Sequence, residues 1–215
     1  HFDLVNWWLS AVPVTVTAVG KREFYTPEMA RRMGLKESHE RCHTCTEKDR
    51  CGFHFDLAAN PSLKALYLDQ EKHDGYHRDQ CVFRPGIDIE DTMNVIVQYD
   101  TGATLCYSVN AFNSWEGYQI AFNGTKGRLE HSVVEQIYVS GTGGVQGGIA
   151  AGGISTRVIP LRGAAEVQEP WTGTGGHGGG DTVMLDDIFL PEAREDKYMR
   201  ASDERGGARS ILIGA

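Results

Sequence analysis

The sequence predicts an α+β fold in which helices flank an open, mostly antiparallel β-sheet. Three observations favour it: a dense apolar helical pattern at the N-terminal end, strand patterns joined by tight turns over residues 92–139, and a helical segment after a glycine-rich turn near residue 180. Because successive hairpins pair neighbouring strands in opposite directions, the sheet is expected to be antiparallel. With 215 residues, 40% of them hydrophobic, the chain can form a full core, and we expect a single domain over residues 1–215.

The first three elements are expected near the N-terminal end. Residues 3–9 have the apolar density of a buried amphipathic helix, and residues 12–20 are rich in β-branched side chains, as a strand is. Thr26 is expected to cap a short helix that begins at Pro27 and ends at Gly34, because this order of residue types favours a helix start and stop.

The central region is expected to be a meander of strands. Its turns are predicted at Asp100–Gly102 and Asn123–Gly127, where glycine, aspartate and asparagine interrupt apolar runs. Around these turns the sequence predicts strands at residues 92–99, 104–110, 118–122, 128–131 and 136–139. A further strand is expected at 156–161, after a glycine-rich segment at 141–153, and a helix at 182–190.

The charge pattern limits the classes of partner. The formal net charge is -8, and acidic and basic residues are mixed along the chain, which argues against a nucleic-acid or anionic-membrane surface. No apolar run approaches the roughly 20 residues that a membrane-spanning helix needs. A small neutral or polar ligand is therefore the expected partner.

Both ends of the chain are expected to be cut from a longer protein. The sequence starts at His1 inside an apolar pattern and stops at residues 211–215, which resemble the beginning of a helix. No targeting segment is visible, so the compartment stays open between cytoplasm and periplasm.

The most informative motif is Gly-Gly-His-Gly-Gly-Gly-Asp at residues 175–181. It puts His177 and Asp181 at a predicted helix start, where glycines allow a ligand to approach and free N–H groups favour polar or anionic partners. A substrate-binding site is one interpretation. The other is that Asp181 only caps the helix and the glycines only form a flexible loop.

Residues 36–86 are polar, rich in cysteine and histidine and too long for a plain connection, so we expect an insertion or lid there. Its spacing C-x2-C-x5-C-x2-H supplies four ligands of the kind that zinc prefers: Cys42, Cys45, Cys51 and His54. A structural zinc site is one hypothesis, with Cys81 as an alternative fourth ligand. Disulfides or free thiols are the other, because the second C-x2-C pair of a zinc ribbon is missing.

A second polar cluster in the same insertion could bind a sugar-like ligand. It offers a phenol, an imidazole, a guanidinium and a carboxylate from Tyr76, His77, Arg78 and Asp79. Loops of this kind are equally often solvated, with a local ion pair between Arg78 and Asp79 or Asp74. Both interpretations stay open.

The order of these motifs along essentially the whole chain resembles the C-terminal domain of the Gfo/Idh/MocA oxidoreductases. The resemblance is carried by the opening His-Phe-Asp-Leu-Val-Asn-Trp-Trp-Leu, the valine-rich strand, the meander with Gly-Thr-Lys-Gly at 124–127, and the motif at 175–181. It implies an open antiparallel sheet that forms a substrate wall and often a dimer interface, so a homo-oligomer through the sheet is expected. It also implies a Rossmann domain that binds NAD or NADP, absent from this chain, in which no G-x-G-x-x-G directly follows a predicted strand as the fingerprint requires.

The resemblance also implies a reaction. The intact protein would move a hydride between a nicotinamide and a carbinol of a sugar, polyol or glycoside, while a histidine takes the hydroxyl proton. The family's catalytic histidine lies three residues before the aspartate that corresponds to Asp3, one position ahead of His1. Only a shifted register would make His1 catalytic, and the chain by itself is expected to be inactive. His177 and Asp181 would then bind substrate.

Three functions follow as expectations. The first is the substrate-binding and dimerisation part of an NAD(P)-dependent sugar oxidoreductase. The second is an NAD-dependent glycosidase or lyase of the same superfamily that works by transient oxidation, because its members carry a stretch similar to residues 175–181. The third is a non-catalytic, zinc-stabilised carbohydrate-binding domain, since one fold can carry many functions.

Overall fold

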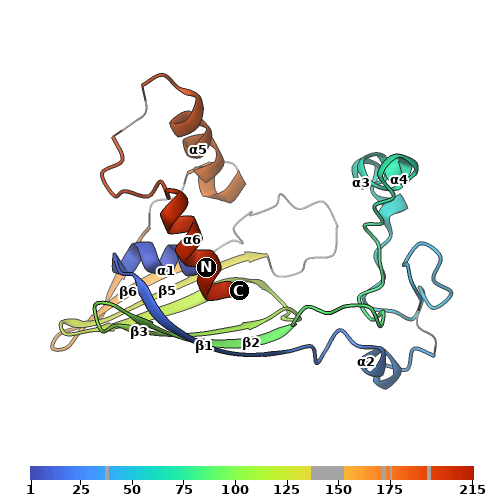
Figure 1. The fold of residues 1–215 in the computed structure, drawn as a ribbon, viewed down its shortest axis with the longest axis horizontal. Helices are drawn as coiled ribbons and strands as arrows, with labels where there is room; N and C mark the ends of the chain where they lie inside the picture. Colours follow the sequence, from blue (N-terminus) through green and yellow to red (C-terminus); the bar gives the residue numbers. More distant parts are fainter. Residues whose placement is uncertain (37–38, 137–152, 171–172, 175, 193–194) are drawn as a thin grey trace. The chain divides into compact units, whose positions relative to one another are not determined.

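The computed structural model describes residues 1–36, 39–136, 153–170, 173–174, 176–192 and 195–215. The chain divides into two compact units. The first unit consists of His1–Cys51, Gln80–Phe112 and Arg194–Ala215, and the second of Gly52–Asp79 and Asn113–Ala193. Figure 1 shows the helices and strands of both.

The first unit is built on an antiparallel sheet of order β1-β2-β3. Its helices and strands are α1 (Phe2–Leu9), β1 (Pro13–Lys21), α2 (Pro27–Arg32), β2 (Thr92–Tyr99), β3 (Thr104–Asn110) and α6 (Glu204–Gly214). The β2–β3 turn is the predicted one: Gly102 donates its N–H to the carbonyl oxygen of Tyr99 at 2.9 Å, with a φ of 84° that glycine adopts without strain.

One face of β2 forms the core of this unit. Val95, Val97 and Tyr99 alternate along the strand and are buried, as the two-residue period of a strand requires. Val5 from α1 and Ile213 from α6 are also buried. The two helices contact each other, α6 contacts β1, and Figure 1 shows both on the same side of the sheet.

The short helix α2 begins as the sequence predicts. The Thr26 side chain caps it by accepting the N–H of Met29 at 3.1 Å, and Gly34 follows the helix with a φ of 83°. The helix and the neighbouring chain share a small buried core of Ala30, Leu35 and Phe83. Local sequence signals therefore fix both ends of this helix.

Asp91, just before β2, connects the end of β1 to the start of α2. Its buried carboxylate accepts the backbone N–H groups of Glu23, Phe24 and Tyr25 at 2.9, 2.8 and 2.8 Å, and the hydroxyl of Thr92 at 3.0 Å. Burial alone would raise the pKa of this carboxyl, but the hydrogen bonds to its charged form outweigh burial and hold the pKa below its ordinary value.

The second unit is built on an antiparallel sheet of order β4-β5-β6-β7. Its strands are β4 (Glu116–Gly124), β5 (Gly127–Gln136), β6 (Ile154–Pro160) and β7 (Glu166–Gln168). Its helices are η1 (Leu57–Ala59), α3 (Pro61–Leu66), η2 (Leu68–Gln70), α4 (Glu71–Asp74), η3 (Gly176–Gly179) and α5 (Gly180–Phe189). The predicted turn after Asn123 joins β4 to β5.

The predicted α+β class with antiparallel strands is confirmed, with three differences in detail. The strands form two sheets in the described part of the chain, where the sequence predicted one. β5 is one continuous strand where two were predicted, and β7 was not predicted because three residues carry too short a pattern. Residues 137–139 and most of the glycine-rich segment, 141–152, lie outside the described residues. Among the helices that are described, none has the length and apolar character to cross a membrane.

Candidate functional site

The start of α1 holds the first candidate site, in the first unit. His1 occupies the N-cap position and is exposed, and its Nδ1 lies 2.9 Å from the hydroxyl of Tyr107 on β3. The ring of Phe2 packs on the same tyrosine, with 4.9 Å between the ring centroids. Burial raises the pKa of Tyr107, so its hydroxyl keeps its proton at neutral pH and can donate it in a hydrogen bond.

Further hydrogen bonds hold α1 in place. Ser202, just before α6, donates its hydroxyl to Oδ1 of Asp3 at 3.1 Å, and Nε1 of Trp7 donates to the carbonyl oxygen of Tyr198 at 2.8 Å. These partners are 199 and 191 positions apart in the sequence. The placement of His1 therefore depends on tertiary contacts.

The glycine-rich motif forms the second candidate site, in the second unit. His177 has left-handed backbone angles, φ 50° and ψ 40°, and its Nδ1 lies 2.9 and 3.0 Å from the two carboxylate oxygens of Asp181. The N-cap of α5 is Gly179, and Asp181 lies in the first helical turn. The alternative interpretation of Asp181 as the N-cap is therefore wrong, and its carboxylate pairs with the imidazole.

This pair changes the charge state of the imidazole. The hydrogen bond that the ring donates to Asp181, followed by the charge of this carboxylate, raises the pKa of His177 above the ordinary histidine value. Both side chains are about half exposed, 54% and 53%, so solvent can reach them and screens the pair. An exposed imidazole that protonates readily can donate hydrogen bonds to the oxygens of a polar ligand.

Two of the predicted sugar-binding residues in the insertion contact each other. Nη1 of Arg78 donates to the hydroxyl of Tyr76 at 3.4 Å, and its guanidinium carbon lies 5.4 Å from the ring centroid of Tyr67. The two tyrosine rings are 6.0 Å apart. The result is a group of two phenols, tilted by 52° to each other, and a cation, in which Tyr67 has no specific signal in the sequence.

The other two predicted residues of this loop differ in exposure. Nε2 of His77 lies 3.9 Å from a carboxylate oxygen of Glu71, a pair that is ionic only when the imidazole is protonated. Asp79 is 1% exposed, whereas Tyr76 is 49% exposed. In this arrangement Tyr76, His77 and Arg78 can reach a ligand, and Asp79 is a buried carboxylate.

The four predicted zinc ligands are divided between the two units. Cys42, Cys45 and Cys51 belong to the first and His54 to the second, and these three cysteines form no disulfide in the part of the chain that the structure describes. Cys51 and Cys81 pack against the same small buried core beside α2. Within the residues that the structure describes, no three His, Cys, Asp or Glu side chains lie close enough to hold a metal ion. Zinc stays a prediction from the spacing.

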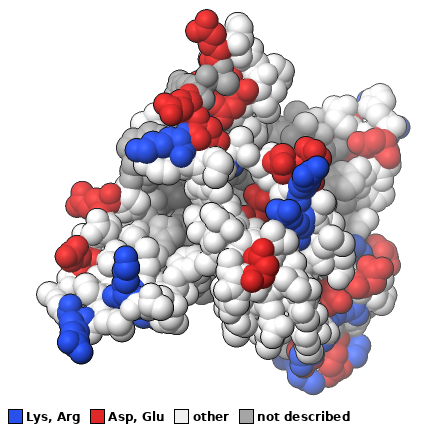
Figure 2. All heavy atoms as spheres, turned by 60° about the vertical axis from the view of Figure 1, so that its left-hand side comes forward, with Lys and Arg blue, Asp and Glu red and all other residues white. Residues whose placement is uncertain are grey.

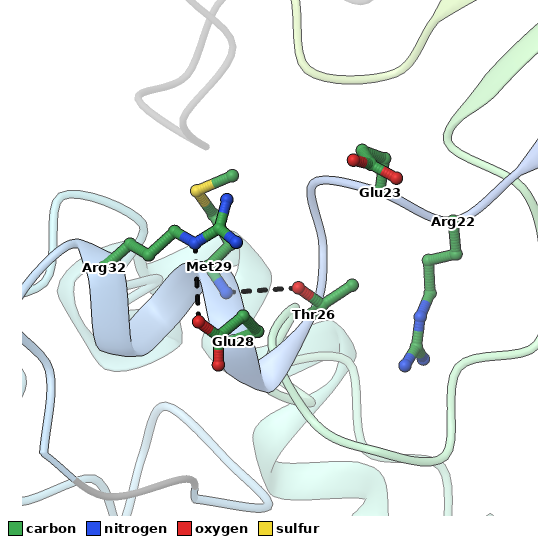
Figure 3. A pocket seen from close by; sticks show the side chains of 6 residues that line it. All are labelled: Arg22, Glu23, Thr26, Glu28, Met29 and Arg32. Atoms are coloured by element: carbon green, nitrogen blue, oxygen red, sulfur yellow. Dashed lines mark hydrogen bonds and ion pairs between the residues drawn. The ribbon is translucent and has the colours of Figure 1, made fainter.

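A hollow of about 220 Å³ lies beside α2 in the first unit (Figure 3). It is lined by Arg22, Glu23, Thr26, Glu28, Met29 and Arg32. Glu28 pairs with Arg31 at 2.6 Å and with Arg32 at 3.4 Å, and Arg22 donates to backbone carbonyl oxygens before β2. Most of its charged groups are thus paired within the protein, and the hollow is not a strong ligand site.

On the face drawn in Figure 2, acidic and basic residues are interspersed among uncharged ones. Among the residues coloured on that face, no broad basic area of the kind that binds nucleic acid is present.

Sequence reasoning singled out the residues of the local contacts but did not predict how they pair, and it missed the distant contacts. The structure pairs His177 with Asp181 and Tyr76 with Arg78, as neighbours in the sequence can be. It also pairs His1 with Tyr107, a residue that the sequence offered only as one position of a strand. The available signal was its inward position beside alternating apolar residues, because a half-buried phenol usually needs a partner.

Comparison with known protein families and sequences identifies relatives over the whole chain. Residues 1–214 match the family described as oxidoreductase family, C-terminal alpha/beta domain. The chain is 34% identical over 221 residues to "Putative oxidoreductase YteT" of Bacillus subtilis (strain 168). This match covers 100% of the chain and 50% of that protein, so the chain spans about half the length of the curated relative.

One solved structure also matches. It is the aldose-aldose oxidoreductase from Caulobacter crescentus complexed with glycerol, at 14% sequence identity, covering 98% of this chain and 42% of that one. The TM-score is 0.42, which is too low to support an argument about fold or ligand.

Proposed function

The chain belongs to the Gfo/Idh/MocA oxidoreductase family, as its C-terminal alpha/beta domain, and on this premise we propose that it is the substrate-binding and dimerisation part of an NAD(P)-dependent oxidoreductase. The substrate class is a sugar, polyol or glycoside. The observation that carries the proposal is the family match over residues 1–214, because it includes both histidine sites.

The two sites give this domain groups suited to a polyhydroxylated substrate. His1 and His177 are both exposed, and each is hydrogen-bonded through Nδ1 to a partner that orients its ring. An imidazole that is oriented through one nitrogen can exchange a hydrogen bond with a hydroxyl group through the other. Neutral sugars are bound by such oriented donors and acceptors, and the mixed surface charge puts no strong field on them.

The cofactor is assigned to the other half of the full-length protein. The strands that the structure describes pair antiparallel and form no βαβ unit, which is the setting in which a G-x-G-x-x-G loop cradles a dinucleotide phosphate. When bound there, the nicotinamide would supply hydride chemistry. The residues of this domain would bind and orient the carbinol, and His1 lies beside the position where the family's proton acceptor is expected.

The first experiment is a spectroscopic assay of the full-length protein. The protein is mixed with NAD or NADP and a panel of free sugars, polyols and aryl glycosides, and absorbance is followed at about 340 nm, where reduced nicotinamide absorbs. Reduction that depends on one class of substrate supports the proposal. Absence of reduction with every substrate and both nucleotides contradicts it.

A second candidate is a glycosidase or lyase that oxidises its substrate only transiently. The feature that favours it is His177 on its glycine-rich turn, paired with Asp181, because the superfamily's NAD-dependent glycosidases carry a similar stretch. Release of the aglycone from aryl glycosides without net reduction of NAD separates this function from the first.

A further inference from the structure

The contact between β3 and the start of α1 places a tyrosine at the proposed reaction site. Tyr107 is half-buried, carries the ring of Phe2 on its own ring, and lies with its hydroxyl 2.9 Å from Nδ1 of His1. We propose that Tyr107 is a positioning residue, which orients the imidazole of His1 through the hydrogen bond at Nδ1. This inference rests on the proposed oxidoreductase function.

The direction of the hydrogen bond decides what His1 can do. Tyr107 keeps its proton, because burial raises the pKa of its phenol. A phenol donates readily to a neutral imidazole, so Nδ1 accepts and the ring proton resides on Nε2. His1 then presents an N–H donor, which suits it to bind a hydroxyl oxygen of the substrate.

Packing makes this orientation rigid. The centroids of the His1 and Tyr107 rings are 5.8 Å apart at an interplanar angle of 55°, and Phe2 covers the tyrosine from the next position in the chain. The other charged side chain identified at this end of α1 is Asp3, which is engaged by the hydroxyl of Ser202. Tyr107 is therefore a group that can orient His1, through both a hydrogen bond and a ring contact.

The test compares two tyrosines in the full-length protein. Tyr107→Phe keeps the ring on Phe2 and removes only the hydroxyl. Tyr99→Phe is the matched control, because Tyr99 is also in the first sheet, also has a pKa raised by burial, and also donates its hydroxyl to α1, at Oδ1 of Asn6 with a distance of 3.0 Å. Tyr99→Phe therefore removes the same kind of hydrogen bond, but at a position away from the start of α1.

Kinetics give the first readout. Loss of one orienting hydrogen bond should lower kcat/KM for the sugar about tenfold in Tyr107→Phe, with nucleotide affinity and thermal stability close to those of Tyr99→Phe. Tyr99→Phe should keep kcat/KM within about twofold of the unchanged protein. Equal kcat/KM in both variants and the unchanged protein would overturn the positioning role.

Nitrogen NMR of the His1 ring gives a second readout that needs no turnover. The unchanged protein should show the Nε2–H tautomer, and Tyr107→Phe should shift the ring toward a mixture of tautomers, while Tyr99→Phe leaves it unchanged. A ring signal that does not respond to Tyr107→Phe contradicts the inference. If no substrate reduces the nucleotide, the proposed function fails, and this measurement still decides whether Tyr107 orients His1.

Discussion

The two histidine sites are held in place in opposite ways. His1 has a partner on another strand, 106 positions away, and α1 is fixed by bonds to the segment before α6. His177 has its partner four positions away, on α5, a helix with no buried residue. The first site depends on the packed core of its unit, and the second depends on one turn of local backbone. Mutations in the core should therefore affect the first, and changes in charge or pH should affect the second.

The largest expected effect is a loss of stability when the hydrogen-bonded carboxylate of Asp91 is removed. Replacing Asp91 with Ala leaves the N–H groups of Glu23, Phe24 and Tyr25 without their acceptor. We expect the free energy of unfolding of the full-length protein to fall by about 3 kcal/mol, because unpaired buried donors carry a desolvation cost. Denaturant titration measures it. Asp88→Ala, an exposed change three residues earlier, is the control and should change little.

The same variant has an expected dependence on pH. The folded pKa of Asp91 is lowered, so its contribution to stability is complete above the unfolded pKa, about 3.9, and is lost as the pH falls through the folded value. The difference in stability between the two proteins should therefore shrink as the solution is made more acidic than about pH 4. A difference that grows in acid would contradict the assignment of Asp91 as a stabilising carboxylate.

Removing the exposed side chain of His177 should weaken sugar binding and leave the stability of the protein nearly unchanged. We expect His177→Ala in the full-length protein to raise KM for the sugar about tenfold, the value of one good hydrogen bond, with nucleotide affinity almost unchanged. Isothermal titration with the nucleotide and steady-state kinetics with the sugar measure the two effects. His73→Ala, an exposed histidine of the same unit, is the control. A large loss of nucleotide affinity with normal sugar binding would refute the assignment of His177 to the substrate-binding site.

The contrast between the local partner of His177 and the distant partner of His1 also explains how much the sequence could predict. The cap at Thr26, the turn after Asn123 and the closeness of His177 to Asp181 are encoded within a few residues, and all three are present in the structure. The partner of His1 is set by the register of β3 against β2, which depends on packing across the sheet. A single sequence does not carry that register, so Tyr107 was not found before the structure.

A smaller effect on stability is expected when one tyrosine hydrogen bond is removed from each unit. In the first unit, Tyr99→Phe removes the donor to Asn6, whose buried Nδ2 has no hydrogen-bond partner among the described residues. We expect unfolding to become easier by about 1 kcal/mol. In the second unit, Tyr118→Phe removes a longer contact, 3.4 Å from Nε2 of His131, and should cost less, because hydrogen bonds weaken with distance. The opposite order in denaturant titrations would contradict this ranking of the two contacts.

The smallest effect is a shift in titration at the exposed pair. Asp181→Asn keeps the shape of the side chain and removes the charge that raises the pKa of His177, so that pKa should move down toward the ordinary histidine value. Because the folded pKa is raised, the pair favours folding fully below the unfolded pKa, and this contribution is lost as the pH rises through the folded value. NMR titration of the His177 ring measures the shift, and Glu169→Gln, an exposed change in the same unit, is the control. A shift of equal size in the control would mean that the general charge of the unit sets the pKa of His177. A shift confined to Asp181→Asn would mean that one local carboxylate sets it, as the four-residue spacing implies.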